Sequence, residues 1–96
     1  MEKYPAVYIM ASKRNGTLYT GVTSNLIKRV YQHKYPEKPG FVSNYECKYL
    51  VFYEQYDDMV NAITREKQIK AGSRKDKLQL IEKMNPEWCD LYESIL

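Results

Sequence analysis

The chain has 96 residues, of which 44% are hydrophobic and 28% charged, and its net charge is +3. A chain of this length forms one small core, so we expect a single domain over residues 1–96. No segment approaches the ~18 apolar residues of a membrane helix, and the N-terminus lacks the apolar core of a signal peptide. These features predict a cytoplasmic protein with no membrane partner.

The cysteine pattern argues against a structural zinc site. Cys47 and Cys89 are far apart in the sequence, and the chain has one histidine. Zinc sites use closely spaced Cys and His pairs. We therefore expect two thiols in a reducing compartment, with a disulfide as the lesser alternative.

Two strands joined by a hairpin are predicted first, over residues 6–11 and 17–22. Asn15-Gly16 between them is a strong hairpin signal, because both residues tolerate positive φ. In a two-residue loop, Tyr8 and Tyr19 would share a face but lie about 13 Å apart along the strand. A longer loop that shifts the register by an even number would keep the shared face and close this gap. Gly21 lies on the same face and would let a ligand approach.

A helix is predicted over residues 25–34, capped by Thr23 or Ser24. We expect its apolar side to consist of Leu26, Ile27, Val30 and Tyr31, and its polar side of Lys28, Arg29, Gln32 and His33. Arg29 and His33 are one turn apart and are expected to point together.

The middle of the chain is predicted to be an irregular loop followed by a strand. Residues 34–48 are interrupted by proline and glycine, and they alternate lysines with aromatic residues: Lys34, Lys38 and Lys48 with Tyr35, Phe41 and Tyr45. This interleaving suits a nucleic-acid strand, and aromatic packing of the loop onto the domain is an equal alternative. Residues 48–56 are rich in β-formers and predict a central or well-covered strand.

Three helices are predicted after this strand. The first runs from a cap at Asp57 or Asp58 to Ala71, with Gly72 as its stop. It carries Glu66 on an apolar stripe, where a carboxylate needs a partner.

The second of these helices begins at Ser73, with Asp76 completing a capping box. The last begins at Asn85-Pro86, read as a cap and a first-turn proline. The element order is therefore β-β-α-β-α-α-α, a small α/β domain with a short sheet covered by helices.

A basic band lies within residues 65–77, which contain six basic and two acidic residues, a net charge of +4. Such a band is a candidate contact for a phosphate backbone, and a solvated helix face is an even alternative. With the lysines of the first predicted helix, the candidate nucleic-acid contacts are Lys28, Lys34, Arg65, Lys67, Lys70, Arg74 and Lys75.

Five residues together have the chemistry needed to hydrolyse a phosphodiester. Glu66 could hold one divalent ion such as Mg²⁺, and Arg29 could bind two phosphate oxygens at once. Tyr8 or Tyr19 could accept the proton of water, with His33 assisting, if a nearby positive group favours the phenolate. The alternatives are tyrosines that only pack, a solvated Arg29–His33 face, and an ion pair between Glu66 and Lys70.

These residues also carry a family resemblance. Ala6-Val7-Tyr8, ten intervening residues and Tyr19-Thr20-Gly21 resemble the two half-motifs of the GIY-YIG nuclease superfamily, and the spacing to Arg29, His33 and Glu66 fits its pattern. The resemblance covers essentially the whole chain and is closest to small stand-alone bacterial members related to the nuclease domain of excinuclease. The chain departs from the pattern at Ala6, Val7 and Thr20. Asn85 is its one late candidate for an asparagine that many relatives place near the site.

The resemblance implies a central three-stranded antiparallel sheet flanked by helices. It also implies a metal-dependent endonuclease that cuts DNA with one Mg²⁺ or Mn²⁺ ion, in DNA repair or processing. By it, Tyr8 and Tyr19 are active-site tyrosines with Tyr8 preferred as the base, Arg29 stabilises the transition state, His33 assists proton movement, and Glu66 is the metal ligand. We expect the five side chains to converge on one concave face.

Two other functions remain open. The chain could be a nucleic-acid-binding module that kept the fold without useful turnover, or an interaction protein that uses its tyrosine-rich face. We expect DNA rather than RNA as the partner, and a protein partner that supplies target specificity also remains open.

Overall fold

The computed structural model describes residues 4–36 and 47–96. The elements in chain order are β1 (Ala6–Ala11), β2 (Leu18–Thr23), α1 (Leu26–Lys34), β3 (Tyr49–Gln55), α2 (Met59–Ala71), α3 (Arg74–Met84) and α4 (Tyr92–Ile95). The three strands form an antiparallel sheet in the order β2-β1-β3. This confirms the predicted fold class. The central strand is β1, and β3 is an edge strand with well-covered faces.

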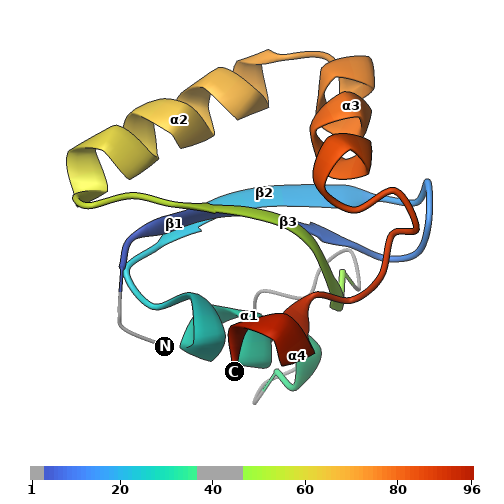
Figure 1. The fold of residues 1–96 in the computed structure, drawn as a ribbon, viewed down its shortest axis with the longest axis horizontal. Helices are drawn as coiled ribbons and strands as arrows, with labels where there is room; N and C mark the ends of the chain where they lie inside the picture. Colours follow the sequence, from blue (N-terminus) through green and yellow to red (C-terminus); the bar gives the residue numbers. More distant parts are fainter. Residues whose placement is uncertain (1–3, 37–46) are drawn as a thin grey trace.

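Helices cover both faces of the sheet (Figure 1). On the face under α2 and α3, the core includes Val7, Ile9, Ala62, Ile69 and Ile81. On the face under α1 and α4, the core includes Tyr8, Met10, Leu26, Val30 and Ile95. Successive side chains of a strand point to opposite faces, so β1 supplies both cores, and all six of its residues are buried.

The β1–β2 hairpin has a longer loop than Asn15-Gly16 alone. The Ser12 N–H donates to the Thr17 carbonyl at 3.0 Å, and Asn15 adopts a φ of 58° inside the loop. The strands consequently pair Tyr8 with Gly21. The register of a two-residue loop is therefore wrong, and the even shift that closes the gap between the tyrosines is confirmed.

The N-terminus of α1 is capped by Asn25, whose Oδ1 accepts from the Lys28 N–H at 3.2 Å. The predicted caps, Thr23 and Ser24, are wrong by one or two positions. The Thr23 hydroxyl instead accepts from the Asn25 N–H at 3.0 Å and so shapes the turn into the helix.

The buried side of α1 consists of Leu26, Val30 and His33. We expected Tyr31 on this side and His33 on the polar side, and both expectations are wrong. Tyr31 is 52% exposed and His33 is fully buried. A buried imidazole costs little when it has a hydrogen-bonding partner, and the Tyr8 hydroxyl supplies one.

The ends of α2 and the start of α3 are as predicted. Asp58 caps α2 by accepting from the Asn61 N–H at 2.8 Å, and α2 ends at Gly72. Ser73 and Asp76 form the reciprocal capping box at the start of α3.

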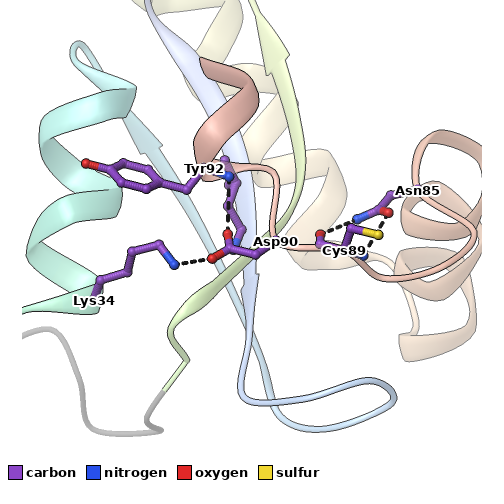
Figure 2. A network of polar contacts seen from close by, with 6 residues as sticks. Lys34, Asn85, Cys89, Asp90 and Tyr92 are labelled. Atoms are coloured by element: carbon purple, nitrogen blue, oxygen red, sulfur yellow. Dashed lines mark hydrogen bonds and ion pairs between the residues drawn. The ribbon is translucent and has the colours of Figure 1, made fainter. Parts of the chain in front are cut away.

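The predicted closing helix from Pro86 is wrong. Asn85 caps the C-terminus of α3, and its amide donates to the carbonyl of Cys89 at 2.7 Å (Figure 2). The same amide donates to the carbonyl of Val51 at 3.3 Å. Its Oδ1 accepts from the Cys89 N–H at 2.9 Å. Val51 is the extra residue of a bulge in β3, so its carbonyl needs a partner outside the ladder. These bonds hold the chain after α3 in an irregular path, and only α4 is helical.

Asp90 completes this C-terminal segment. Its carboxylate accepts from the backbone N–H groups of Leu50 at 3.1 Å and Tyr92 at 3.2 Å, and it pairs with Lys34 of α1 (Figure 2). The Leu91 N–H donates to the Leu50 carbonyl at 2.8 Å. The outer edge of β3 is thereby covered over this stretch.

Cys47 is buried and Cys89 is exposed, and they do not form a disulfide, which confirms the predicted thiols. Lys38, Phe41 and Tyr45 of the predicted basic and aromatic loop lie outside the described residues. Among the helices that the structure describes, none is long and apolar enough to cross a membrane.

Candidate active site

Three aromatic side chains from β1, β2 and α1 meet on the face of the sheet under α1. The Tyr8 hydroxyl and His33 Nε2 are hydrogen-bonded at 3.1 Å. The ring of Tyr19 lies 6.2 Å from that of Tyr8 and 5.0 Å from that of His33, measured between centroids. The structure thus brings together both predicted tyrosines and the predicted histidine.

Gly21 makes this packing possible. A Cβ at this position would lie 2.6 Å from the Tyr8 hydroxyl and 3.0 Å from the Tyr19 ring. The expectation that Gly21 leaves room for a ligand is wrong, because the phenol of Tyr8 occupies that space. Since β2 is an edge strand, Tyr8 extends across it towards the edge of the sheet.

The Tyr8 hydroxyl is held in its neutral form. Burial raises the pKa of Tyr8 well above its usual value, and the neighbouring Tyr19 and the Glu66 carboxylate raise the pKa further. The positive charge of Arg29 acts in the opposite direction and lowers the pKa of Tyr8. Tyr8 is therefore protonated at neutral pH.

Glu66 and Arg29 come from opposite faces of the sheet. α2 packs on one face and α1 on the other (Figure 1), so the expectation of one shared face is wrong for Glu66. Both charges nevertheless act on Tyr8. The five predicted residues therefore come from both faces of the sheet, and the charges of Arg29 and Glu66 act on the same hydroxyl.

The Glu66 carboxylate pairs with Lys70 at 3.0 Å, one turn along α2, which is the structural alternative considered for it. Its side chain is 15% exposed. The described residues contain no group of three His, Cys, Asp or Glu side chains that could hold a metal ion. A lone carboxylate fits Mg²⁺, which is often bound by one or two carboxylates together with water and substrate phosphates.

A polar groove of about 330 Å³ lies at the N-terminus of α1, and the sequence alone did not predict it. It is lined by Thr23, Ser24, Asn25, Lys28, Arg29 and Gln32. The first turn of α1 has no acidic residue. Two cations beside a helix N-terminus favour a phosphate. The sequence signal for this groove is the adjacent Lys28-Arg29 pair in the first turns of α1, shortly after the cap residue Asn25.

The predicted nucleic-acid contacts divide into two groups. Four have partners within the protein: Lys34 pairs with Asp90, Arg65 with Glu54, Lys70 with Glu66, and Arg74 donates to the carbonyls of Asn15 and Gly16. The other three, Lys28, Lys67 and Lys75, are exposed. An ion-paired lysine or arginine offers less charge to a phosphate, whereas Arg74 keeps its charge because its partners are neutral.

Asn85 is not brought to the tyrosines. Its amide lies against β3, the edge strand opposite β2, where it satisfies backbone groups of Val51 and Cys89. Its role in this chain is structural.

The chain is similar to known proteins over most of its length. The GIY-YIG catalytic domain matches residues 4–79. A UPF0213 protein of Syntrophus aciditrophicus is 43% identical over 84 residues, covering 84% of this chain and 92% of that protein. UPF0213 protein SSP2268 of Staphylococcus saprophyticus is 35% identical over 75 residues, covering 78% and 90%.

A solved structure is also similar. The solution NMR structure of the UPF0213 protein BH0048 from Bacillus halodurans has a TM-score of 0.53 and 26% identity, and the match covers 88% of each chain. The names of these relatives state no activity. With both half-motifs inside the matched region, the chain belongs to the GIY-YIG family of the nuclease superfamily and, within it, to the UPF0213 proteins.

Proposed function

We propose that this protein is a metal-dependent endonuclease that hydrolyses phosphodiester bonds in DNA during repair or processing, and that it acts in the cytoplasm. One observation carries the proposal: the Tyr8 hydroxyl is hydrogen-bonded to His33 and also lies in the fields of Arg29 and Glu66. A buried hydroxyl whose pKa is strongly raised and that has specific charged neighbours is a candidate for a functional site.

Arg29 and the groove beside it would bind the scissile phosphate. The guanidinium can donate to two non-bridging oxygens, and Lys28 adds charge from the same groove. Because negative charge grows on these oxygens during attack, Arg29 would stabilise the transition state more than the bound substrate.

We assign the proton-accepting role to Tyr19 rather than to Tyr8. Tyr8 is buried and bonded to His33, so it suits holding the imidazole in place. Tyr19 is only partly buried, and its ring lies beside the same imidazole. In this arrangement His33 would assist the movement of the proton away from Tyr19.

Glu66 would hold one Mg²⁺ or Mn²⁺ ion, which when bound lowers the pKa of water and stabilises negative charge on phosphate oxygens. Its present partner Lys70 is 53% exposed. If Glu66 held the metal ion, Lys70 would be available to contact the DNA backbone beside Lys67.

The second candidate is a nucleic-acid-binding module of the same fold. The Glu66–Lys70 ion pair favours it, because an i, i+4 pair accounts for the carboxylate without a metal ion. In that case Lys28, Lys67 and Lys75 would bind phosphates, and turnover would be negligible.

The test is a cleavage assay on labelled single-stranded, duplex and branched DNA, and on RNA of the same sequence. Each substrate is incubated with Mg²⁺, with Mn²⁺ or with a chelator. We expect metal-dependent cleavage of DNA by the wild type and not by Arg29→Ala, while Arg14→Ala, a change of an exposed arginine in the β1–β2 loop, stays active. Salt-sensitive binding without cleavage of any substrate would favour the binding module instead.

A further inference from the structure

The outer side of α1 carries two tyrosines that the proposed chemistry does not use. Tyr31 is 52% and Tyr35 is 60% exposed, and their ring centroids are 5.0 Å apart. Tyr31 lies on α1 and Tyr35 is the C-cap residue that follows it, and their neighbouring rings form a continuous aromatic surface. An exposed aromatic pair contributes little to the core and offers a large area for stacking.

This surface is continuous with the groove that holds Arg29. Gln32 follows Arg29 by three residues and Lys28 by four, and Tyr31 follows Lys28 by three. Residues at these spacings are neighbours on a helix surface. The exposed side of α1 therefore runs from Arg29, through Gln32 and Lys28, to the tyrosine pair.

The charge of the helix selects the kind of partner. α1 contains Lys28, Arg29 and Lys34 and has no acidic residue. Lys34 is paired with Asp90, which leaves Lys28 and Arg29 as the cations beside the tyrosines. A pair of cations next to a pair of exposed rings fits a nucleic-acid strand, which offers phosphates to the cations and bases to the rings.

We propose that the outer face of α1 binds an unpaired nucleotide next to the scissile phosphate, with its base stacked on Tyr31 and Tyr35. This rests on the proposed function for the position of the scissile phosphate at Arg29. Bases in the interior of a duplex are stacked on both faces and cannot offer a face to these rings, so the surface selects substrates with a single-stranded segment beside the cut. A strand that leaves the site across α1 would place phosphates at Arg29 and Lys28 before a base reaches the tyrosines.

The test measures binding in the presence of a chelator, so that cleavage does not intervene. Fluorescence anisotropy would follow three labelled ligands of equal length: a single strand, the same strand with abasic sites, and a blunt duplex. We compare the wild type with the double variants Tyr31→Ala/Tyr35→Ala and Tyr31→Phe/Tyr35→Phe. Val60→Ala, a change of an exposed residue on α2, is the control.

We expect the alanine variant to lose about tenfold or more in affinity for the single strand, in line with the loss of one stacked base. The phenylalanine variant and the control should bind like the wild type. Affinity for the abasic strand and for the duplex should be nearly the same in all four proteins.

Equal single-strand affinity of the wild type and the alanine variant would overturn this inference, as would an equal loss on the abasic strand. Neither result would contradict the proposed nuclease activity, which is tested separately by metal-dependent cleavage. Conversely, the wild type could cut no substrate while the alanine variant selectively loses single-strand binding. That result would support the stacking surface and contradict the nuclease proposal. If the pair serves a protein partner, the alanine variant binds every nucleic acid like the wild type.

Discussion

The two edges of the sheet use buried polar groups in opposite ways. Along β3, the side chains of Asn85 and Asp90 each bond to backbone groups of nearby segments of the same chain. Along β2, a neutral hydroxyl lies in the fields of an arginine and a glutamate. The hydrogen bonds of Asn85, Asp90 and Tyr8 all end within the fold, so hydrogen bonding alone does not distinguish the two edges. The difference is that Tyr8 has a raised pKa and charged neighbours of both signs, which marks a candidate functional site.

The β3 edge shows what the C-terminal segment contributes. The domain match ends at residue 79, yet the segment beyond it covers the edge of β3 and ties α1 to the sheet through Lys34 and Asp90 (Figure 2). An uncovered edge strand would be open to pairing with other chains. This segment therefore protects the fold and holds the helix that carries Arg29 and His33.

The largest effect is expected on cleavage, from Arg29→Ala. Loss of the guanidinium leaves the developing charge uncompensated, so the rate should fall by at least about 10²-fold, or ~3 kcal/mol. Stability should change little, because Arg29 lies outside the buried side of α1. Single-turnover rates of Arg29→Ala and Arg29→Lys check this, and the lysine variant should fall between the alanine variant and the wild type. Equal rates in all three proteins would remove Arg29 from the site.

The next largest effect is expected on stability, from Asn85→Ala. The change leaves the Val51 and Cys89 backbone groups without their side-chain partner, which should cost about 1–3 kcal/mol. Urea unfolding measures this loss, with the exposed Glu87→Ala as a neutral control. Cleavage per folded molecule should be unchanged. A stable Asn85→Ala protein with lost activity would instead assign Asn85 to the site.

A smaller effect is expected on the pH dependence of stability, from Tyr8→Phe. The folded-state pKa of Tyr8 is raised by burial. Below about pH 10, the ordinary tyrosine pKa, both the folded and the unfolded wild type are protonated. Above it the unfolded chain ionises first, so the free energy of unfolding falls as pH rises.

Tyr8→Phe removes this group, and the stability difference between wild type and variant should therefore shrink or reverse as pH rises above about 10. Unfolding measured from pH 7 to 11 tests the sign. A difference that stays constant over this range would contradict the burial of the hydroxyl.

The smallest effect is expected on salt dependence, from Lys67→Ala and Lys75→Ala. Each exposed lysine that contacts a phosphate should reduce the slope of log affinity against log salt by about 0.9 on duplex DNA. Arg65→Ala should reduce it less, because Arg65 is paired with Glu54. Titrations at several salt concentrations measure the slopes. A larger change in slope for Arg65→Ala than for either lysine variant would argue against phosphate contacts by Lys67 and Lys75.

Local patterns predicted much of the fold. The caps of α2 and α3 were identified because each depends on residues within four positions of one another, such as Ser73 and Asp76. The resemblance implied the three-stranded antiparallel sheet, and the tyrosine spacing required only an even register shift.

The errors arose where partners are distant in sequence. Asn85 resembled a helix start, and its bond to Val51 spans 34 positions. His33 resembled a polar surface residue because its partner Tyr8 lies on a strand 25 positions away. Helical periodicity placed Glu66 on a stripe of α2, but it contains no information on which face of the sheet that helix covers.

Single-turnover cleavage by Glu66→Gln in Mg²⁺ tests the central claim most directly. Glutamine keeps the shape of the side chain and removes the charge that a metal ion needs. We predict that metal-dependent cleavage is abolished, while the free energy of unfolding changes by only a few tenths of a kcal/mol, the value of a lost i, i+4 ion pair. Cleavage at the wild-type rate, or a clearly destabilised variant, would contradict the assignment of Glu66 as the metal ligand.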